Sequence, residues 1–127
     1  MKPKGTILIV DDDEGHRYTT RLILENAGFE VKETATGDEA LRLAEEHPDI
    51  IILDLHLPDI AGIEICRILK TTPQTEDINV LHVTALYPGA EERAESLAAG
   101  ADAYFMRPID PAQLLTTIQV LLARRAM

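Results

Sequence analysis

The sequence predicts an α/β fold in which one five-stranded parallel sheet carries helices on both faces. Three observations support this prediction: apolar runs alternate with segments of helical periodicity, the connections between them are short, and residues 50–53 are apolar at every position. A strand without polar alternation is typical of a sheet that is covered on both faces. Strands that alternate with helices in this way are joined by right-handed crossovers, which make the sheet parallel.

Five apolar runs are expected to form the strands. Each is short and ends at polar or turn-forming residues. In chain order they are residues 6–10, ending at Asp11; 29–33, after a stop at 26–28; 50–53, ending at Asp54; 80–83, ending at Thr84; and 103–106, ending at Arg107 and Pro108.

The segments between these runs have apolar residues at helical spacing, which are expected to face the core. In chain order these residues are Tyr18, Leu22 and Ile23; Ala40, Leu43, Ala44 and His47; Ile65, Ile68 and Leu69; Ala94, Leu97, Ala98 and Ala101; and Leu114, Ile118, Leu121 and Leu122. Pro48 is expected to end the second helix, Pro88 and Gly89 to form the loop before the fourth, and Gly100 to close it. Asp110 and Pro111 are an N-cap and a first-turn proline for the fifth.

Composition narrows the classes of function. The 127 residues are expected to form one domain spanning 1–127, and 22 acidic against 12 basic side chains give a net charge of −10. Because such a surface repels nucleic acid and anionic lipid, we expect a protein or a cation as partner, with no direct nucleic-acid or membrane binding. Residues 1–5 lack the apolar stretch of a secretory signal, so a cytoplasmic location is expected. The single cysteine, Cys66, excludes an internal disulfide and is expected to be a buried filler.

Polar residues follow four of the five expected strands. Asp11 and Asp12 follow the first, Asp54 the third, Thr84 the fourth and Arg107 the fifth. Because the carboxyl ends of parallel strands meet at one edge of the sheet, these side chains are expected to converge there. Taken alone, the acidic triplet at 11–13 is better explained as a solvated turn and helix cap. The joint pattern instead favours a site for Mg²⁺, which prefers oxygen ligands.

Four motifs, in order, resemble the receiver domain of response regulators in two-component signalling, and the resemblance covers residues 6–123. They are Ile-Leu-Ile-Val-Asp-Asp-Asp at 7–13, Leu-Asp-Leu-His-Leu-Pro-Asp-Ile-Ala-Gly at 53–62, Val-Thr-Ala at 83–85 and Ala-Gly-Ala-Asp-Ala-Tyr-Phe-Met-Arg-Pro at 99–108. The resemblance implies a flavodoxin-like, doubly wound (βα)5 fold with strand order 2-1-3-4-5. It also implies a signalling module rather than an enzyme.

By this resemblance, Asp54 accepts a phosphoryl group from a histidine kinase or a histidine phosphotransfer protein. Asp12 and Asp54 would bind Mg²⁺ together with the backbone carbonyl of His56, and Asp11 would hold a metal-bound water. The ion would neutralise charge during phosphoryl transfer.

The same resemblance implies how the signal leaves the site. Thr84 would donate a hydrogen bond to the phosphoryl group, and Tyr104, which by position alone is expected in the core, would turn inward behind it. This change would reshape the surface of the fourth helix, fifth strand and fifth helix, which a downstream output domain or protein reads. Leu86, two residues after Thr84, is apolar and cannot orient a water by hydrogen bonding, which predicts slow hydrolysis of the phosphoryl group unless His56 supplies that contact.

Two residues depart from the family pattern. Arg107 stands where lysine is usual, and Ala61 replaces a frequent aspartate outside the chemistry. Arginine is larger than lysine and pairs bidentately with carboxylates, so Arg107 is expected to fork onto both oxygens of Asp54 and slow its phosphorylation. The alternative function is therefore a receiver-like interaction module that signals without phosphorylation.

Two further alternatives match less of the sequence. The Asp-x-Asp of residues 11–13 also occurs in haloacid-dehalogenase phosphatases, but Gly15 stands where they have threonine or valine. The Asp54-x-His56 spacing occurs in cobalamin modules, but Asp59 stands where they have glycine. The sequence leaves open the kinase, the output, and whether the chain is a whole regulator or part of a longer protein.

Overall fold

Five parallel strands form one sheet in the order β2-β1-β3-β4-β5 in the computed structural model, which describes residues 4–85 and 89–125. The strands are β1 (Thr6–Val10), β2 (Glu30–Thr34), β3 (Ile50–Asp54), β4 (Asn79–Thr84) and β5 (Ala103–Met106). The predicted fold class and strand order are confirmed. Every strand begins and ends within about one residue of its predicted position, because apolar runs bounded by polar residues mark buried strands clearly.

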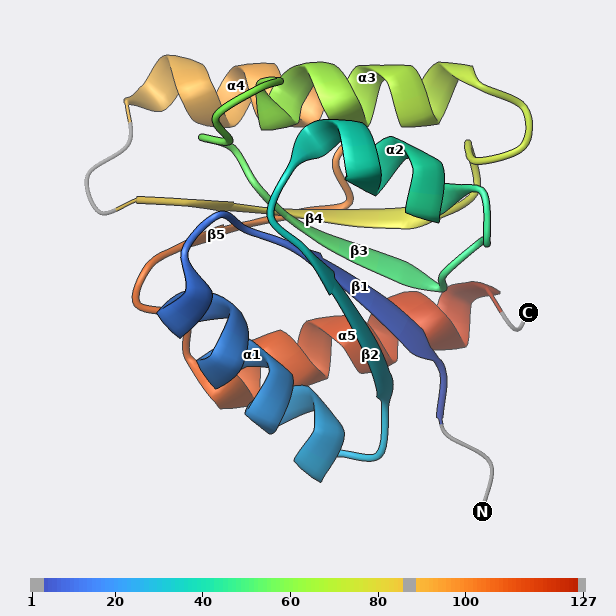
Figure 1. Cartoon of the computed structure of the whole chain (residues 1–127), viewed down its shortest axis with the longest axis vertical. Coiled ribbons are helices and arrows are strands. Elements are labelled where there is room, and N and C mark those ends of the chain that lie inside the picture. Colours follow the sequence, from blue (N-terminus) through green and yellow to red (C-terminus); the bar gives the residue numbers. More distant parts are fainter. Residues whose placement is uncertain (1–3, 86–88, 126–127) are drawn as a thin grey trace.

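Helices cover both faces of the sheet, with α1 and α5 on one face and α2, α3 and α4 on the other (Figure 1). The helices are α1 (Glu14–Asn26), α2 (Gly37–Ala44), α3 (Gly62–Thr71), α4 (Ala90–Ala98) and α5 (Pro111–Arg125). None of the helices within the described ranges is long and apolar enough to cross a bilayer.

Alternation along the central strands divides the core into two layers. In β1, Ile7 and Ile9 pack toward Leu24 of α1 and Leu114 of α5. The intervening Leu8 and Val10 face the opposite layer, which contains the following residues of α2 and α3: Ala40, Ala44, Ile65, Cys66 and Leu69. Both faces of the sheet are therefore buried, as the unbroken apolar runs predicted.

The predicted inward faces of α1 and α3 are partly wrong. In α1, Tyr18 is 54% exposed and Leu22 is 39% exposed, and the buried residues are Thr20 and Leu24. In α3, Ile68 lies at the surface, whereas Ile65, Cys66 and Leu69 are buried as expected. Periodicity identifies which residues share a face, but the packing of the helix on the sheet decides which face is buried. Burial raises the pKa of the Cys66 thiol to about 11, so this residue is an unreactive filler.

The predicted inward face of α4 is also wrong. Ala94, Leu97 and Ala98 are exposed, and Ser96 is the buried residue of the helix. The Ser96 hydroxyl lies 2.6 Å from Nδ1 of His82 in β4, so a buried hydrogen bond compensates for the burial of both polar groups. A polar residue therefore takes the place that the apolar pattern assigned to Leu97.

The end of α2 differs from the prediction as well. The helix ends at Ala44, and His47 is exposed and adopts a left-handed φ of 57°. The backbone N–H of His47 donates to the carbonyl of Ala44 at 2.9 Å, which closes a tight turn before Pro48. Two other predictions, the loop at Pro88 and the role of Leu86, lie outside the described residues.

Candidate functional site

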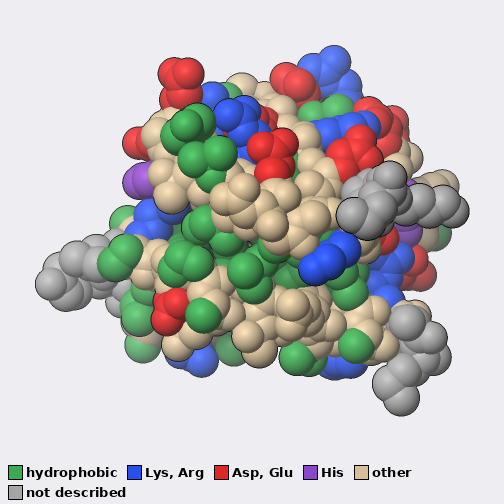
Figure 2. Space-filling model, turned by 90° about the horizontal axis from the view of Figure 1, so that it is seen from below, with side chains coloured by type: hydrophobic (Ala, Val, Ile, Leu, Met, Phe, Trp, Pro, Cys, Tyr) green, Lys and Arg blue, Asp and Glu red, His purple; other side chains and the backbone are tan. Residues whose placement is uncertain are grey.

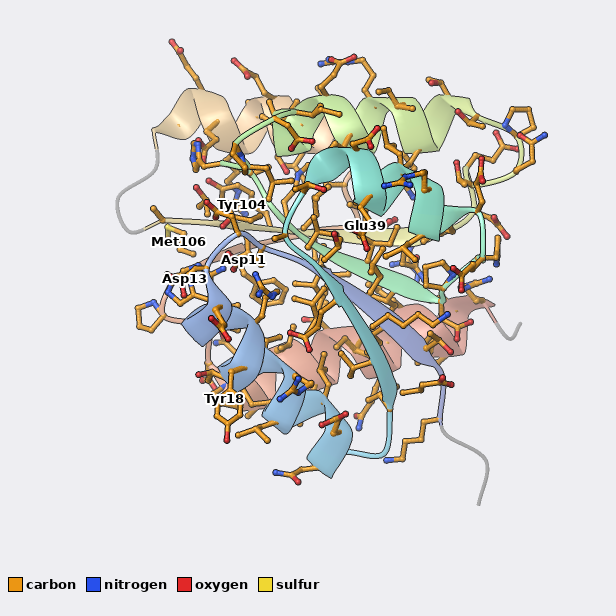
Figure 3. All side chains as sticks on the ribbon, viewed as in Figure 1. Asp11, Asp13, Tyr18, Glu39, Tyr104 and Met106 are labelled. Carbon is orange, nitrogen blue, oxygen red and sulfur yellow. The ribbon has the colours of Figure 1, made fainter. Side chains whose placement is uncertain are left out.

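Three carboxylates gather at the carboxyl ends of β1 and β3. Asp11 and Asp12 follow β1, and Asp54 ends β3, the strand next to β1. One carboxylate oxygen from each of these residues lies within 4.8 Å of the other two. The convergence predicted from the strand ends is therefore present. Figure 3 shows Asp11 at this edge of the sheet, together with Asp13 and Tyr104.

Asp11 is the buried member of this cluster, with only 3% of its surface exposed. Burial raises the pKa of Asp11, and the nearby charge of Asp54 raises it further. A hydrogen bond from the backbone N–H of Asp13, at 2.8 Å, and the charge of Arg107 oppose this rise. Asp13 itself caps α1 by accepting a hydrogen bond from the backbone N–H of His16 at 2.8 Å, as the simpler explanation of the triplet predicted.

The loop after β3 folds back onto Asp54. The backbone N–H of His56 donates to Asp54 Oδ1 at 2.7 Å, which orients the carboxylate. A Cβ atom at Gly62 would lie 2.4 Å from the carbonyl oxygen of Asp54, so only glycine allows α3 to begin this close to the strand. The start of the loop therefore orients the Asp54 carboxylate through Oδ1, and the end of the loop packs closely against the Asp54 backbone.

Arg107 reaches the cluster from the end of β5, but its predicted geometry is wrong. Its Nη2 pairs with Asp11 Oδ2 and lies 3.8 Å from Asp54 Oδ2, so no fork onto both oxygens of Asp54 forms. Asp11 is more deeply buried than Asp54, and a buried charge needs a partner more than a hydrated one does. Arg107 thus partly neutralises the cluster mainly through Asp11.

Thr84 and Tyr104 lie beside the cluster on β4 and β5. Thr84 is buried, and its hydroxyl donates a hydrogen bond to Glu92 Oε1. The expected core position of Tyr104 is wrong, because the side chain is only partly buried and its hydroxyl donates to the same Glu92 oxygen at 3.3 Å. His56 Nε2 lies 3.1 Å from the other oxygen of Glu92.

Two further residues belong to this site that the sequence did not predict. Glu92 lies in the first turn of α4, where an acidic residue is common for helix stability alone. His16 lies far from the other three histidines in the sequence, yet its Nδ1 lies 3.7 Å from Asp11 Oδ2. A signal for His16 existed, because it follows the Asp13 cap in the first turn of α1 and so starts close to the end of β1.

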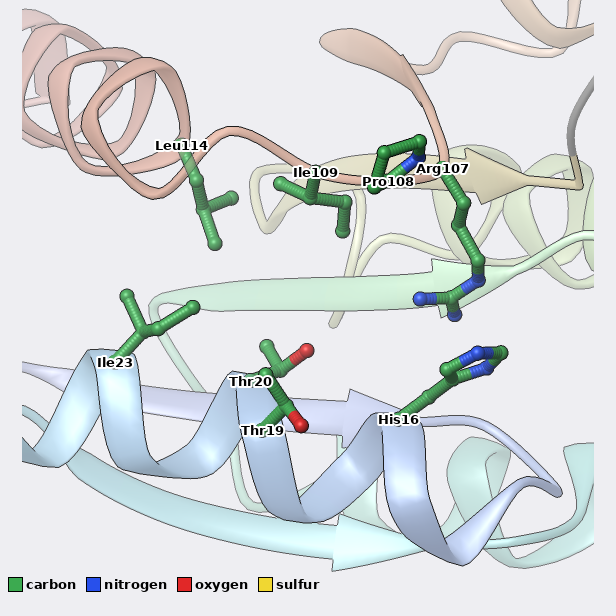
Figure 4. Close-up of a pocket in the computed structure, with 8 residues that line it drawn as sticks. All are labelled: His16, Thr19, Thr20, Ile23, Arg107, Pro108, Ile109 and Leu114. Atoms are coloured by element: carbon green, nitrogen blue, oxygen red, sulfur yellow. The ribbon is translucent and has the colours of Figure 1, made fainter.

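A groove opens next to the carboxylates, between α1 and the segment that joins β5 to α5. Its volume is about 350 Å³. Figure 4 shows His16 and Arg107 approaching each other at one end, Ile23 and Leu114 at the other, and Ile109 between them. The groove is therefore largely apolar, with cationic and titratable groups where it meets the acidic cluster.

Known proteins of similar sequence and structure are response regulators and receiver domains. Residues 7–119 match the family model described as the response regulator receiver domain. The chain is 42% identical over 126 residues to the phosphate regulon transcriptional regulatory protein PhoB of Rhizobium meliloti (strain 1021), which covers 98% of this chain and 54% of PhoB. The chain thus spans about half the length of that relative.

Two solved structures share the fold over almost the whole chain. A putative response regulator from Chloroflexus aurantiacus J-10-fl superposes with a TM-score of 0.89 and 35% identity, covering 96% of this chain and 99% of that one. The receiver domain of sensor histidine kinase PA1611 from Pseudomonas aeruginosa PAO1 superposes with a TM-score of 0.85 and 26% identity, covering 94% and 98%. In that structure a magnesium ion is coordinated in the active site cleft.

Proposed function

Because the chain belongs to the response regulator receiver family, we propose that it is a single phosphoacceptor receiver domain, with a core at residues 6–123 and Asp54 as the acceptor. The observation that carries this proposal is the position of Asp54. It ends a central strand, its Oδ1 is held by the His56 N–H at 2.7 Å, and one oxygen of each of two further carboxylates lies within 4.8 Å of one of its own oxygens, close enough to share a cation. The donor would be a histidine kinase or a histidine phosphotransfer protein.

The transfer is a displacement at phosphorus. An Asp54 carboxylate oxygen forms the new P–O bond as the P–N bond to the histidine of the donor breaks, and the imidazole nitrogen keeps the electron pair and takes up a proton. His56 contributes by holding Asp54 Oδ1, which leaves Oδ2 as the attacking oxygen. Arg107, at 3.8 Å from Oδ2, balances the charge of the resting carboxylate.

The donor atoms at this edge fit Mg²⁺, because all of them are oxygens and the three carboxylates carry more negative charge than Arg107 balances. Asp12, Asp54 and the carbonyl of His56 would hold the ion, with Asp11 holding one of its waters. When bound, the ion supplies charge neutralisation to the transferring phosphoryl group.

The phosphodonor would approach over the α1 face. His16 and Arg107 line the groove and contact Asp11, and Tyr18 and Leu22 are exposed on α1, which forms one wall of the groove. Hydrophobic side chains also gather across the middle of this face (Figure 2). An amphipathic helix that bears the donor histidine matches this chemistry, with apolar contacts to the groove and the histidine next to Asp54.

Output would use the opposite side of the site. Thr84 and Tyr104 lie against α4, and Leu97 of α4 and Met106 of β5 are 51% and 54% exposed. A phosphoryl group that engages Thr84 would change the position of Tyr104 and of α4, and so alter a surface that carries exposed apolar side chains for a downstream domain or protein.

A mass measurement tests the proposal. After treatment with a small acyl phosphate and Mg²⁺, the wild-type chain should gain one phosphoryl group, and Asp54→Asn should gain none. Asp38→Asn is the matched control, since it removes an exposed carboxylate of α2 and should leave the gain intact. If the wild type gains no phosphoryl group and Arg107→Lys does, the interaction module is the better description.

A further inference from the structure

Helix α4 is attached to the sheet by fewer apolar contacts than the neighbouring α3. In α3, the side chains of Ile65, Cys66 and Leu69 are buried. In α4, the buried residue is Ser96, and Leu97 is 51% exposed. Since apolar burial supplies most of the stabilisation of a helix on a sheet, the position of α4 depends on polar contacts to an unusual degree.

One of these polar contacts is made at each end of the helix. Near its C-terminal end, Ser96 is bonded to His82, as described above. Near its N-terminal end, Glu92 is the polar contact, and its side chain is 22% exposed. Its carboxylate accepts hydrogen bonds from Thr84 and Tyr104 and lies 3.1 Å from His56 Nε2. Glu92 thus connects α4 with His56, Thr84 and Tyr104, which lie at the same edge of the sheet as Asp54.

The hydrogen bond from Thr84 to Glu92 uses the same hydroxyl that would donate to a phosphoryl oxygen on Asp54. A threonine hydroxyl has one proton to donate, so Thr84 cannot donate to Glu92 and to a phosphoryl oxygen at the same time. Both acceptors are anionic and compete for the same donor. A phosphoryl group on Asp54 would also place additional negative charge close to the Glu92 carboxylate, and like charges at this separation repel.

We propose that Glu92 is an internal competitor of the phosphoryl group: its carboxylate occupies the Thr84 hydroxyl in the resting protein, holds α4 in place, and is expelled when Asp54 is phosphorylated. This inference rests on the proposed function of Asp54. Expulsion breaks the contacts of Glu92 with Thr84 and Tyr104, so one event loosens the N-terminal end of α4 and frees the tyrosine hydroxyl. The few apolar contacts of α4 make this release sufficient to shift the helix.

Glu92→Gln tests the proposal with a minimal change of shape. The amide keeps the size of the side chain but removes the charge, so it competes less for Thr84 and does not repel the phosphoryl group. Beryllofluoride in the presence of Mg²⁺ serves as the phosphoryl analogue, with binding followed through the backbone amide NMR signals of α4. We expect Glu92→Gln to bind beryllofluoride about tenfold more tightly than wild type. Amide exchange in α4 should be faster in the unliganded variant than in unliganded wild type.

Glu91→Gln is the matched control, because it makes the same charge change at an exposed neighbouring position of α4. It should bind and exchange like wild type. Equal beryllofluoride affinity in Glu92→Gln and wild type would overturn the competition while leaving the phosphoacceptor function intact. If Glu91→Gln bound beryllofluoride as tightly as Glu92→Gln, the gain would come from the lower net charge alone and the competition would be overturned. If neither wild type nor Glu92→Gln binds the analogue, both the competition and the proposed function are wrong, whereas binding by Glu92→Gln alone would support the competition.

Discussion

The two edges of the sheet each carry a cluster of charged side chains, but the balance of charge differs between them. At the carboxyl ends of the strands, Asp11, Asp12 and Asp54 lie together, and Arg107 pairs with the Asp11 carboxylate and lies 3.8 Å from that of Asp54. The most buried of these carboxylates, Asp11, has a raised pKa because burial outweighs the favourable contacts around it. This edge therefore has an excess of negative charge that a bound cation would relieve.

At the amino ends of the strands, acidic and basic groups are matched. Asp49 accepts a hydrogen bond from the backbone N–H of Thr6 at 2.8 Å, and Arg125 contacts it at 3.3 Å. His47 Nε2 lies 2.8 Å from Asp77, and this hydrogen bond holds the pKa of Asp77 below its ordinary value. Each carboxylate here already has its partners, so this cluster stabilises the fold and needs no ligand.

The comparison shows that charge alone does not distinguish a functional cluster from a structural one. Both clusters contain carboxylates and an arginine near the ends of the strands. They differ in whether the negative charges are compensated within the protein.

The largest expected effect concerns magnesium. If the cluster of Asp11, Asp12 and Asp54 binds Mg²⁺ only in the folded state, Mg²⁺ at 100 times its dissociation constant should stabilise the protein by about 2.7 kcal/mol. Thermal unfolding with and without the ion measures this gain. Asp12→Asn should lose most of it, while Asp49→Asn, at the matched edge, should keep it. An unchanged melting temperature of the wild type in millimolar Mg²⁺ would remove the basis for the metal site.

The next effect concerns Arg107. Its guanidinium pairs with Asp11 Oδ2 and so competes with a cation for the cluster, whereas lysine is smaller and leaves more room for the ion. Asp54 should be phosphorylated about tenfold faster in Arg107→Lys than in wild type, which corresponds to a barrier lower by about 1.4 kcal/mol. The rate of phospho-Asp54 formation with the same donor and Mg²⁺ measures the change. Equal rates would mean that Arg107 is a working substitute for lysine.

The smallest effect is a change in the free energy of unfolding that has opposite signs at the two edges of the sheet. Without divalent ions, Asp12→Asn removes one of three repelling charges and should raise the free energy of unfolding by ~0.5 kcal/mol. Asp49→Asn weakens the contact with Arg125 and should lower it by ~1 kcal/mol. Urea unfolding in the presence of a chelator compares the two. Changes of the same sign would show that the two clusters do not differ in charge balance.

The strands, and the edge at which the functional residues meet, could be predicted from local sequence pattern. Residues 50–53 form a short run of aliphatic residues bounded by polar ones, which favours a strand buried on both faces, and Asp54 follows them directly. Since all five strands run parallel, residues that follow them must lie at the same edge. The gathering of Asp11, Asp54 and Thr84 therefore follows from local sequence pattern and topology alone.

The contacts of the long polar side chains could not be predicted from the sequence, because they depend on tertiary packing. Arg107 lies near more than one carboxylate. It pairs with Asp11 rather than Asp54 because Asp11 is more deeply buried, and no local sequence pattern encodes this difference. The burial of Ser96 in place of Leu97 depends on His82, 14 residues away on β4. Likewise, Glu92 meets Thr84 only because α4 packs beside β4 and β5. Periodicity and strand order constrain the backbone, whereas the pairing of polar side chains depends on which groups the folded protein removes from water.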